Sequence, residues 1–250
     1  MQEDSSTKSW NQVGEAWCEL AQTNDFRIHF IMPYTLEQLG DVSGKSILDL
    51  GCGEGGYARE LARRNANVVA IDCSEFFINY AKAKAQEEGL NIVHHIRNSN
   101  DLYNIEGHSF DIVLCSMMLM DCEDLVGTVK EIVRVLKPSG KLFASVLHPC
   151  FNGKHIQWQG EDKDKKVVVE NYFYPEEWEK PVSRGIDKKV IWRHRTLQDY
   201  VKVFVSAGLT IEDLNEPFPT QKQAEQSIRI KWLERIPMFL FWQLRKSDCK

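Results

Sequence analysis

The chain has 250 residues, of which 43% are hydrophobic, and a formal net charge of -5 at pH 7. This length suits one α/β domain with insertions or two small domains, and the acidic balance gives no overall attraction to nucleic acid or to anionic membranes, so neither is an expected partner. The seven cysteines are scattered without a C-x-x-C pair and no apolar run reaches membrane-spanning length, which disfavours a disulfide framework, a zinc site and a membrane protein, and indicates a reducing cytoplasm.

Residues 1–43 are predicted to form an N-terminal helical lid. The first nine residues are polar and lack the apolar core of a secretion signal. Apolar residues then recur at helical spacing between residues 10 and 21, which predicts an amphipathic helix. Pro33 is expected to break the next helical stretch. Trp10 and Trp17 either anchor the first helix or fold over a ligand.

Residues 44–148 alternate between strand and helix patterns. Strands are expected at Ser46–Leu50, Asn67–Ile71, Ile92–Ile96, Phe110–Cys115 and Lys141–Leu147, and helices near Tyr57–Arg64, Glu75–Glu88 and Asp124–Leu136. Ser74 is a predicted N-cap and Gly89 a helix stop, while Pro138 to Gly140 predict a turn. This order is typical of a doubly wound, mostly parallel, Rossmann-like α/β sheet, and the apolar strands indicate that both of its faces are covered.

The segment after residue 148 breaks this pattern. Residues 149–195 are rich in aromatic and charged side chains and are predicted to form an inserted antiparallel cap for the substrate, with strands at Val167–Tyr174 and Lys188–Arg193. Residues 196–250 are expected to complete the core with a helix capped by Thr196 and with two further strands. Those strands are Leu209–Leu214 and Met238–Leu244, separated by a helical segment at 222–235. The expected sheet therefore has seven strands.

The most informative segment joins the first strand to the following helix. Glycines at positions 51, 53, 55 and 56 let backbone N–H groups approach a ligand and point at it from a helix start. The segment therefore predicts a nucleotide-type cofactor site at the carboxyl end of the first strand. The spacing of three of these glycines, with Asp72 at the end of the second strand, also fits a dinucleotide site.

A second reading of this segment rests on Asp49, which lies inside the strand where a dinucleotide-binding strand is usually apolar. The order D-x-G-x-G-x-G that begins at Asp49 resembles the first motif of class I S-adenosylmethionine-dependent methyltransferases. Downstream, Phe110–Cys115 and Glu131–Phe143 are similar to the later strands and turn of that family. The resemblance covers residues 44–148 well, residues 196–244 loosely, and the cap not at all.

The resemblance implies S-adenosylmethionine as the cofactor and S-adenosylhomocysteine as its product. Asp72 would accept hydrogen bonds from the ribose hydroxyls, and Asp49 would receive the methionine ammonium directly or through water. In the family an acid after the third strand reads adenine. Here Asn98 stands at that position, and Asp101 is the alternative contact. The cofactor-binding residues implied in this way are Asp49, Gly51, Cys52, Gly53, Asp72, Cys73, Asn98, Ser99, Asp101, Cys115 and Ser116.

Methyl transfer from a sulfonium is an in-line displacement in which the cofactor supplies the reactivity and the protein positions the reactants. An acceptor that must lose a proton benefits from a base, and His148, at the end of the fifth strand, is the predicted catalytic residue. It can act as that base, orient the substrate, or be structural. The predicted substrate-side residues are Met117, His148, Phe151, Tyr172 and Tyr174. The aromatic residues of the cap either roof a pocket or form the cap's own core.

The sequence thus predicts a cytoplasmic methyltransferase acting on an N, O or C atom of a small molecule. A nucleic-acid methyltransferase is disfavoured by the acidic charge and because Cys115 to Met118 stand where Asn/Asp-Pro-Pro-aromatic is expected. A protein or peptide methyltransferase and a non-catalytic S-adenosylmethionine-binding protein are the open alternatives. A dinucleotide dehydrogenase is disfavoured by Asp49 and by the later motifs.

Overall fold

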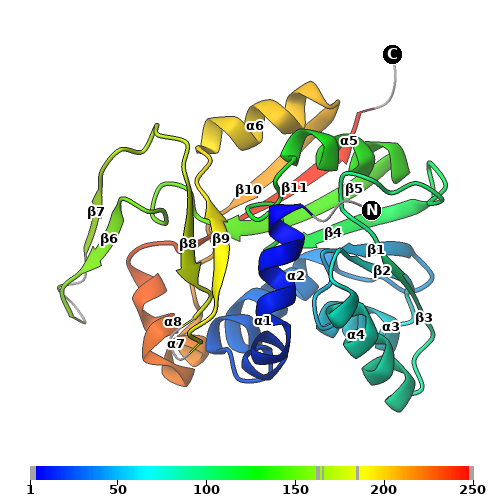
Figure 1. The fold of residues 1–250 in the computed structure, drawn as a ribbon, viewed down its shortest axis with the longest axis horizontal. Coiled ribbons are helices and arrows are strands. Elements are labelled where there is room, and N and C mark those ends of the chain that lie inside the picture. Colours follow the sequence, from blue (N-terminus) through cyan, green and yellow to red (C-terminus); the bar gives the residue numbers. More distant parts are fainter. Residues whose placement is uncertain (1–3, 162–163, 165, 184–185, 248–250) are drawn as a thin grey trace.

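The computed structural model describes residues 4–161, 164, 166–183 and 186–247 (Figure 1). Its centre is a seven-stranded sheet in the order β10-β11-β5-β4-β1-β2-β3. The strands are β1 (Ser46–Leu50), β2 (Asn67–Asp72), β3 (Ile92–Ile96), β4 (Phe110–Ser116), β5 (Leu136–Leu147), β10 (Leu209–Asn215) and β11 (Phe239–Lys246). Strands β1 to β5 run parallel, whereas β11 pairs antiparallel with both β5 and β10. The predicted doubly wound, mostly parallel sheet is confirmed.

Helices cover both faces of this sheet, α5 and α6 on one face and α2 to α4 on the other (Figure 1). The helices are α1 (Ser5–Ala21), α2 (Met32–Leu39), α3 (Gly56–Arg63), α4 (Glu75–Glu87), α5 (Leu125–Val135), α6 (Leu197–Ser206), α7 (Gln221–Gln226) and α8 (Ile228–Lys231). Alternation along β1 explains the two layers. Leu48 and Leu50 pack into the core beneath α5 and α6, while Ile47 packs toward α2 and α3. Asp49 lies on the same side as Ile47, near the carboxyl end of the strand.

Two predicted local features differ from the structure. Pro33 does not end the helical stretch, because the π-helix Arg27–Ile31 leads directly into α2 and Pro33 occupies one of the first positions of α2, where proline is tolerated. The residues around the predicted turn at Pro138 belong to β5, which begins at Leu136. The turn survives as an irregularity in the pairing, because Leu136 lies opposite Phe110 whereas Lys141 already lies opposite Ile112. Residues 137–140 therefore bulge from the ladder.

The cap, residues 149–195, contains two antiparallel hairpins apart from the main sheet (Figure 1). Strands β6 (Ile156–Gln159) and β7 (Lys166–Val169) form the first, and β8 (Glu177–Pro181) and β9 (Lys189–Arg193) form the second. The predicted strand Val167–Tyr174 is shorter than expected, because the chain leaves the ladder after Val169. None of the helices in the described part of the chain is long and apolar enough to cross a membrane.

Candidate functional site

A cavity of about 500 Å³ lies where the carboxyl ends of β1, β2 and β4 meet. Parallel strands bring these ends to one edge of the sheet, which is where ligands bind in open α/β folds. Helix α1 and the cap supply the opposite walls. Some of the described lining residues lie at the carboxyl ends of β1, β2 and β4 or in the loops that follow β1 to β4. They are Asp49, Leu50, Gly51, Cys52, Glu54, Ile71, Asp72, Cys73, Arg97, Asn98, Ser99, Ser116, Met117, Met118, Met120, Asp121 and Cys122.

The loop after β1 is fixed to the end of β2 by backbone hydrogen bonds. The N–H groups of Gly51 and Cys52 donate to the carbonyl of Ile71 at 2.8 and 3.0 Å. Gly51 has a φ of +71°, and a Cβ at this position would lie 2.7 Å from Cβ of Met118. Only glycine satisfies both constraints, so the loop keeps its backbone close to the cavity.

Asp72 ends β2 and is buried, with its side chain on the cavity wall. Its Oδ2 accepts from the N–H of Gly53 at 2.9 Å, and its Oδ1 accepts from the N–H of Ser74 at 2.9 Å. Burial raises the pKa of this carboxyl above its usual range, while the two N–H donors act against that rise. Each oxygen keeps a lone pair for a ligand, so the carboxylate both orders the glycine loop and presents two acceptors.

Asp49 is 2% exposed, and its Oδ2 has no hydrogen-bond partner among the described residues. Burial, with a smaller contribution from the negative charge of Glu54, raises the pKa of Asp49 to about 7. A buried oxygen without a donor is costly to a folded protein. Its position on the cavity wall provides a place for a cationic donor from a ligand.

Glu54, which was not predicted from the sequence, anchors the glycine loop through its side chain. Its side chain is 2% exposed and accepts from Nη2 of Arg59 at 2.9 Å and from Arg27. It also accepts from the N–H of Gly56 at 3.1 Å. Arg27 precedes α2 in a short π-helix and lines the cavity. The sequence gives no sign of the ion pair between Arg27 and Glu54, because these residues lie 27 positions apart.

The loop after β3 reaches the cavity through Asn98 and Ser99, two of the residues predicted to bind the cofactor. Asn98 donates from Nδ2 to Oδ2 of Asp4 at 2.6 Å, and Asp4 is itself the N-cap of α1. Two other predicted contacts differ from the structure. Asp101 is exposed and is not among the lining residues, since the chain has turned away by that point. Cys115 is fully buried in the core rather than at the cavity surface.

Helix α1 covers one side of the cavity with two tryptophans. Trp10 and Trp17 both line it, and their rings meet edge to face with centroids 5.5 Å apart. Trp10 also lies 6.3 Å from the ring of Phe77 at the start of α4. These indoles therefore anchor the helix and face the cavity at the same time.

His148 is placed differently from the prediction. It is 3% exposed and absent from the cavity lining, whereas its neighbours Leu147 and Pro149 face the cavity. Its Nε2 lies 2.6 Å from Oε1 of Glu216, and its Nδ1 accepts from the N–H of Cys150 at 3.2 Å. Burial lowers the pKa of His148, and Glu216 partly opposes this. Both ring nitrogens thus serve contacts within the protein.

The remaining predicted substrate residues divide in the same way. Met117 lines the cavity, while Phe151, Tyr172 and Tyr174 do not. Tyr172 accepts through its hydroxyl from the N–H of Leu197 at 2.9 Å, and Tyr174 is 66% exposed. These rings therefore support the cap or face solvent.

Three tryptophans of the cap form an aromatic wall of the cavity. Trp158, Trp178 and Trp192 line it. The rings of Trp178 and Trp192 stack with an interplanar angle of 24° and centroids 6.4 Å apart, and Trp158 donates from Nε1 to the carbonyl of Phe151 at 2.9 Å. Phe26 and Phe239 line the cavity from outside the cap. An aromatic group would be held there by stacking and edge contacts.

Comparisons with known proteins agree with this geometry. Residues 48–144 match the family model described as methyltransferase domain. The chain is 31% identical over 147 residues to the ubiquinone biosynthesis O-methyltransferase of Hahella chejuensis, and the match spans 58% of this chain and 61%, less than two thirds, of that relative.

Two solved structures share the fold. An S-adenosylmethionine-dependent methyltransferase from Mesorhizobium loti superposes with a TM-score of 0.73 at 24% identity, covering 90% of this chain and 99% of that one. The 1,6-didemethyltoxoflavin-N1-methyltransferase of Burkholderia thailandensis, solved with bound 1,6-didemethyltoxoflavin and S-adenosylhomocysteine, superposes with a TM-score of 0.60 at 14% identity, covering 99% of this chain and 93% of that one.

Proposed function

We propose that this chain is a class I S-adenosylmethionine-dependent methyltransferase that transfers the methyl group of that cofactor to a small-molecule acceptor, and the match of residues 48–144 to a methyltransferase domain supports this. The observation that carries the proposal is the pair of buried carboxylates, Asp49 and Asp72, on one cavity wall at the ends of adjacent parallel strands. When bound, the cofactor supplies an electrophilic methyl group on sulfur. The chain itself has to hold, orient and dehydrate the reactants.

The donors and acceptors of the site fit this cofactor. Asp72 offers one lone pair on each oxygen, which suits the two hydroxyls of a ribose. The unpartnered Oδ2 of Asp49 suits the ammonium of the methionine portion. Between them, the backbone of Gly51 and Cys52 leaves room for the chain that joins these groups. Asn98 and Ser99, with Phe77 and Trp10, line the side where the adenine would lie.

The rest of the cavity supports a small acceptor over a polymer. The cap and α1 cover the strand ends, and the volume of about 500 Å³ falls within the range of roughly 300–1,000 Å³ that small-molecule sites occupy. Part of that volume goes to the cofactor, so the acceptor is of metabolite size. The walls of Trp158, Trp178 and Trp192 favour a planar, partly apolar molecule.

The raised pKa of Asp49 makes cofactor binding pH-dependent in a definite direction. Near a bound ammonium the pKa of Asp49 falls, so binding releases a proton wherever the free protein is protonated, below pH about 7. Affinity should therefore rise as the pH increases toward about 7 and then level off. Calorimetry across this range should show a smaller slope and a weaker affinity for Asp49→Asn. Because the pKa of Asp72 is also raised, the difference between wild type and variant isolates Asp49. Identical slopes would remove Asp49 from the ammonium site.

Two measurements test the proposed function. Calorimetry with S-adenosylmethionine and NAD in parallel should detect binding of the first alone. A screen with methyl-labelled cofactor should then transfer label to one or more phenols, aromatic amines or aromatic acids, and not to peptides, tRNA or duplex DNA. Binding of NAD in place of S-adenosylmethionine would overturn the cofactor assignment. Label found only on a polymer would overturn the small-molecule acceptor.

A further inference from the structure

The loop after β4 is held rigidly by two arginines at the end of β9. Arg195 donates from Nη1 to the carbonyl of Met120 at 3.1 Å, and Arg193 donates from Nη1 to the carbonyl of Asp121 at 2.7 Å. The N–H of Asp121 closes a turn by donating to the carbonyl of Met118 at 2.9 Å. The backbone of Asp121 is thereby fixed on both sides, although it belongs to a loop.

The side chain of Asp121 has no such partners. Asp121 lines the cavity, and among the described residues its carboxyl group is influenced by the charges of Arg193 and Arg195 without a hydrogen bond from either. Arg193 donates from Nη1 to Ser6 as well, from Nη2 to Ser5 and from Nε to Glu177. Arg195 donates from both of its terminal nitrogens to backbone carbonyls of the loop. The two guanidinium groups therefore attract the carboxylate without occupying its lone pairs.

Among the five carboxyl side chains of described residues that line the cavity, Asp121 alone lacks a role. Asp4 caps α1 and accepts from Asn98. Glu54 is paired with arginines, and Asp72 holds the glycine loop. Asp49 faces the place proposed for the cofactor ammonium.

The position of Asp121 lies between the cofactor side and the acceptor side. The turn that ends at Asp121 begins at Met118, whose side chain lies against Gly51 of the glycine loop. On its other side, Asp121 accepts through its backbone carbonyl from Arg193, which lines the same cavity as Trp192 of the aromatic wall. A carboxylate in this position can contact a polar group on a molecule held by the cap tryptophans while that group points toward the cofactor.

From this arrangement we infer that Asp121 binds the hydroxyl or amine of an aromatic acceptor and takes its proton during methyl transfer. The inference rests on the proposed function. The acceptor oxygen or nitrogen forms a bond to the methyl carbon, and the carbon–sulfur bond breaks with its electron pair going to sulfur, which becomes a neutral thioether. The proton of the acceptor passes to Asp121 and later to water. No further reactant is needed.

The surroundings of Asp121 are compatible with this role near neutral pH. Burial raises the pKa of Asp121 to about 7, and Arg193 and Arg195 act in the opposite direction. Tyr200 from α6 and Cys122 from the same loop are the other titratable groups that interact with it. A base is most effective when its pKa lies near the working pH. Turnover should therefore rise with pH through about 7 as Asp121 loses its proton.

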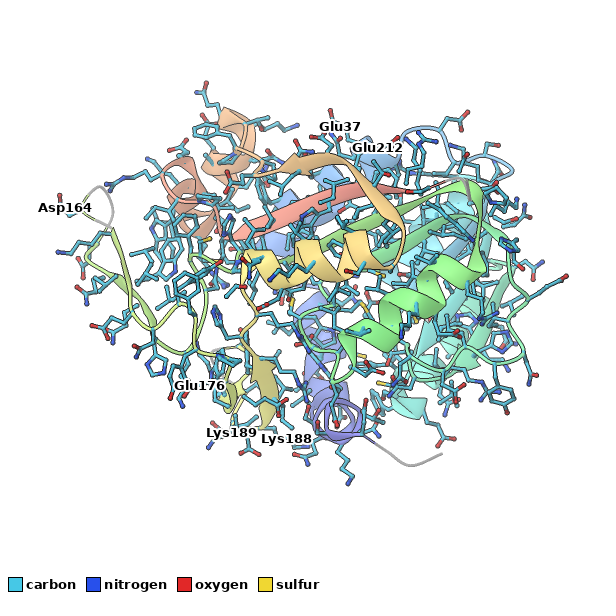
Figure 2. The ribbon with its side chains drawn as sticks, turned by 90° about the horizontal axis from the view of Figure 1, so that it is seen from above. Glu37, Asp164, Glu176, Lys188, Lys189 and Glu212 are labelled. Atoms are coloured by element: carbon cyan, nitrogen blue, oxygen red, sulfur yellow. The ribbon has the colours of Figure 1, made fainter. Side chains whose placement is uncertain are left out.

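The decisive variant is Asp121→Asn, which keeps the size of the side chain and removes its basicity. With the acceptor found in the labelling screen, kcat should fall by roughly 100-fold or more, the scale of general base catalysis. The dissociation constant of S-adenosylmethionine should stay within about twofold, and the rise of kcat near pH 7 should disappear. Asp121→Glu should restore part of the turnover. Asp164→Asn, at the far end of the β6–β7 hairpin, is the matched control and should behave as wild type (Figure 2).

An infrared titration tests the same carboxylate without an acceptor. The difference between wild type and Asp121→Asn should contain a carboxyl band that titrates near pH 7. Absence of that band, an unchanged kcat in the variant, or equal losses of kcat and cofactor affinity would each overturn the assignment. If the wild type labels no acceptor, the proposed function fails, and the infrared band alone then decides whether Asp121 is a free, titrating carboxyl group in the cavity.

Discussion

Replacing Asp72 with alanine is expected to weaken the binding of S-adenosylmethionine by about 1.5–3 kcal/mol, which corresponds to a roughly 10- to 150-fold higher dissociation constant. Hydrogen bonds to a charged acceptor are of this strength, and the buried Asp72 would offer two of them to the ribose. The same substitution also removes the acceptor for the N–H of Gly53, which loosens the glycine loop. Both effects weaken the binding of S-adenosylmethionine. Calorimetry on the purified protein measures the change.

A second carboxyl group near the cofactor side serves as the control for this prediction. Asp101 lies in the loop after β3, is exposed and is not part of the cavity lining. Asp101→Ala should therefore leave the dissociation constant within about twofold. An unchanged affinity in Asp72→Ala would remove Asp72 from the ribose, and a large loss in Asp101→Ala would restore Asp101 as the alternative adenine contact that the sequence suggested.

The sheet was predictable because most of its strands can be recognised from a short stretch of sequence. The inner strands β1, β2 and β4 are short, mainly apolar runs followed by turns, and such runs belong to strands covered on both faces. The β1 motif is equally local, since the glycines and Asp49 lie within seven residues of one another. Asp72 was found from the same logic, because the ends of neighbouring parallel strands meet at one edge.

The acceptor side of the cavity was less predictable for physical reasons. His148 lies one residue from two lining residues, and alternation at a strand end decides which of them faces the cavity. That alternation cannot be read without knowing which face is covered. The loop that carries Asp121 is held by arginines more than 70 positions away. Hydrogen bonds between residues so far apart leave no pattern in the sequence. The cap tryptophans were recognised as aromatic residues, but their partners depend on how two hairpins pack.

Glu54 gives the largest expected effect on stability. Glu54→Gln should lower the free energy of unfolding by about 3–5 kcal/mol, because breaking a buried ion pair leaves a charge without compensation. The side chain is 2% exposed, and its partners Arg59 and Arg27 are 9% and 18% exposed. After the substitution Arg59 keeps Glu88 as its ion-pair partner, at 3.2 Å and near the surface, and its hydrogen bond to the backbone carbonyl at position 54. Arg27 keeps its hydrogen bond to the carbonyl of Ala21.

Glu60→Gln on α3, the helix that follows the loop of Glu54, is the matched control for Glu54→Gln. Glu60 pairs with Arg63 and Arg64, whose side chains are 48% and 40% exposed, and solvent screens such pairs, so its loss should cost at most about 1 kcal/mol. Urea unfolding of both variants measures the difference, with equal m-values showing that the unfolded states are comparable. Similar losses in the two variants would mean that the Glu54 cluster is hydrated. A loss confined to Glu54→Gln, accompanied by weaker cofactor binding, would show that this buried charge cluster holds the glycine loop in the shape that the cofactor requires.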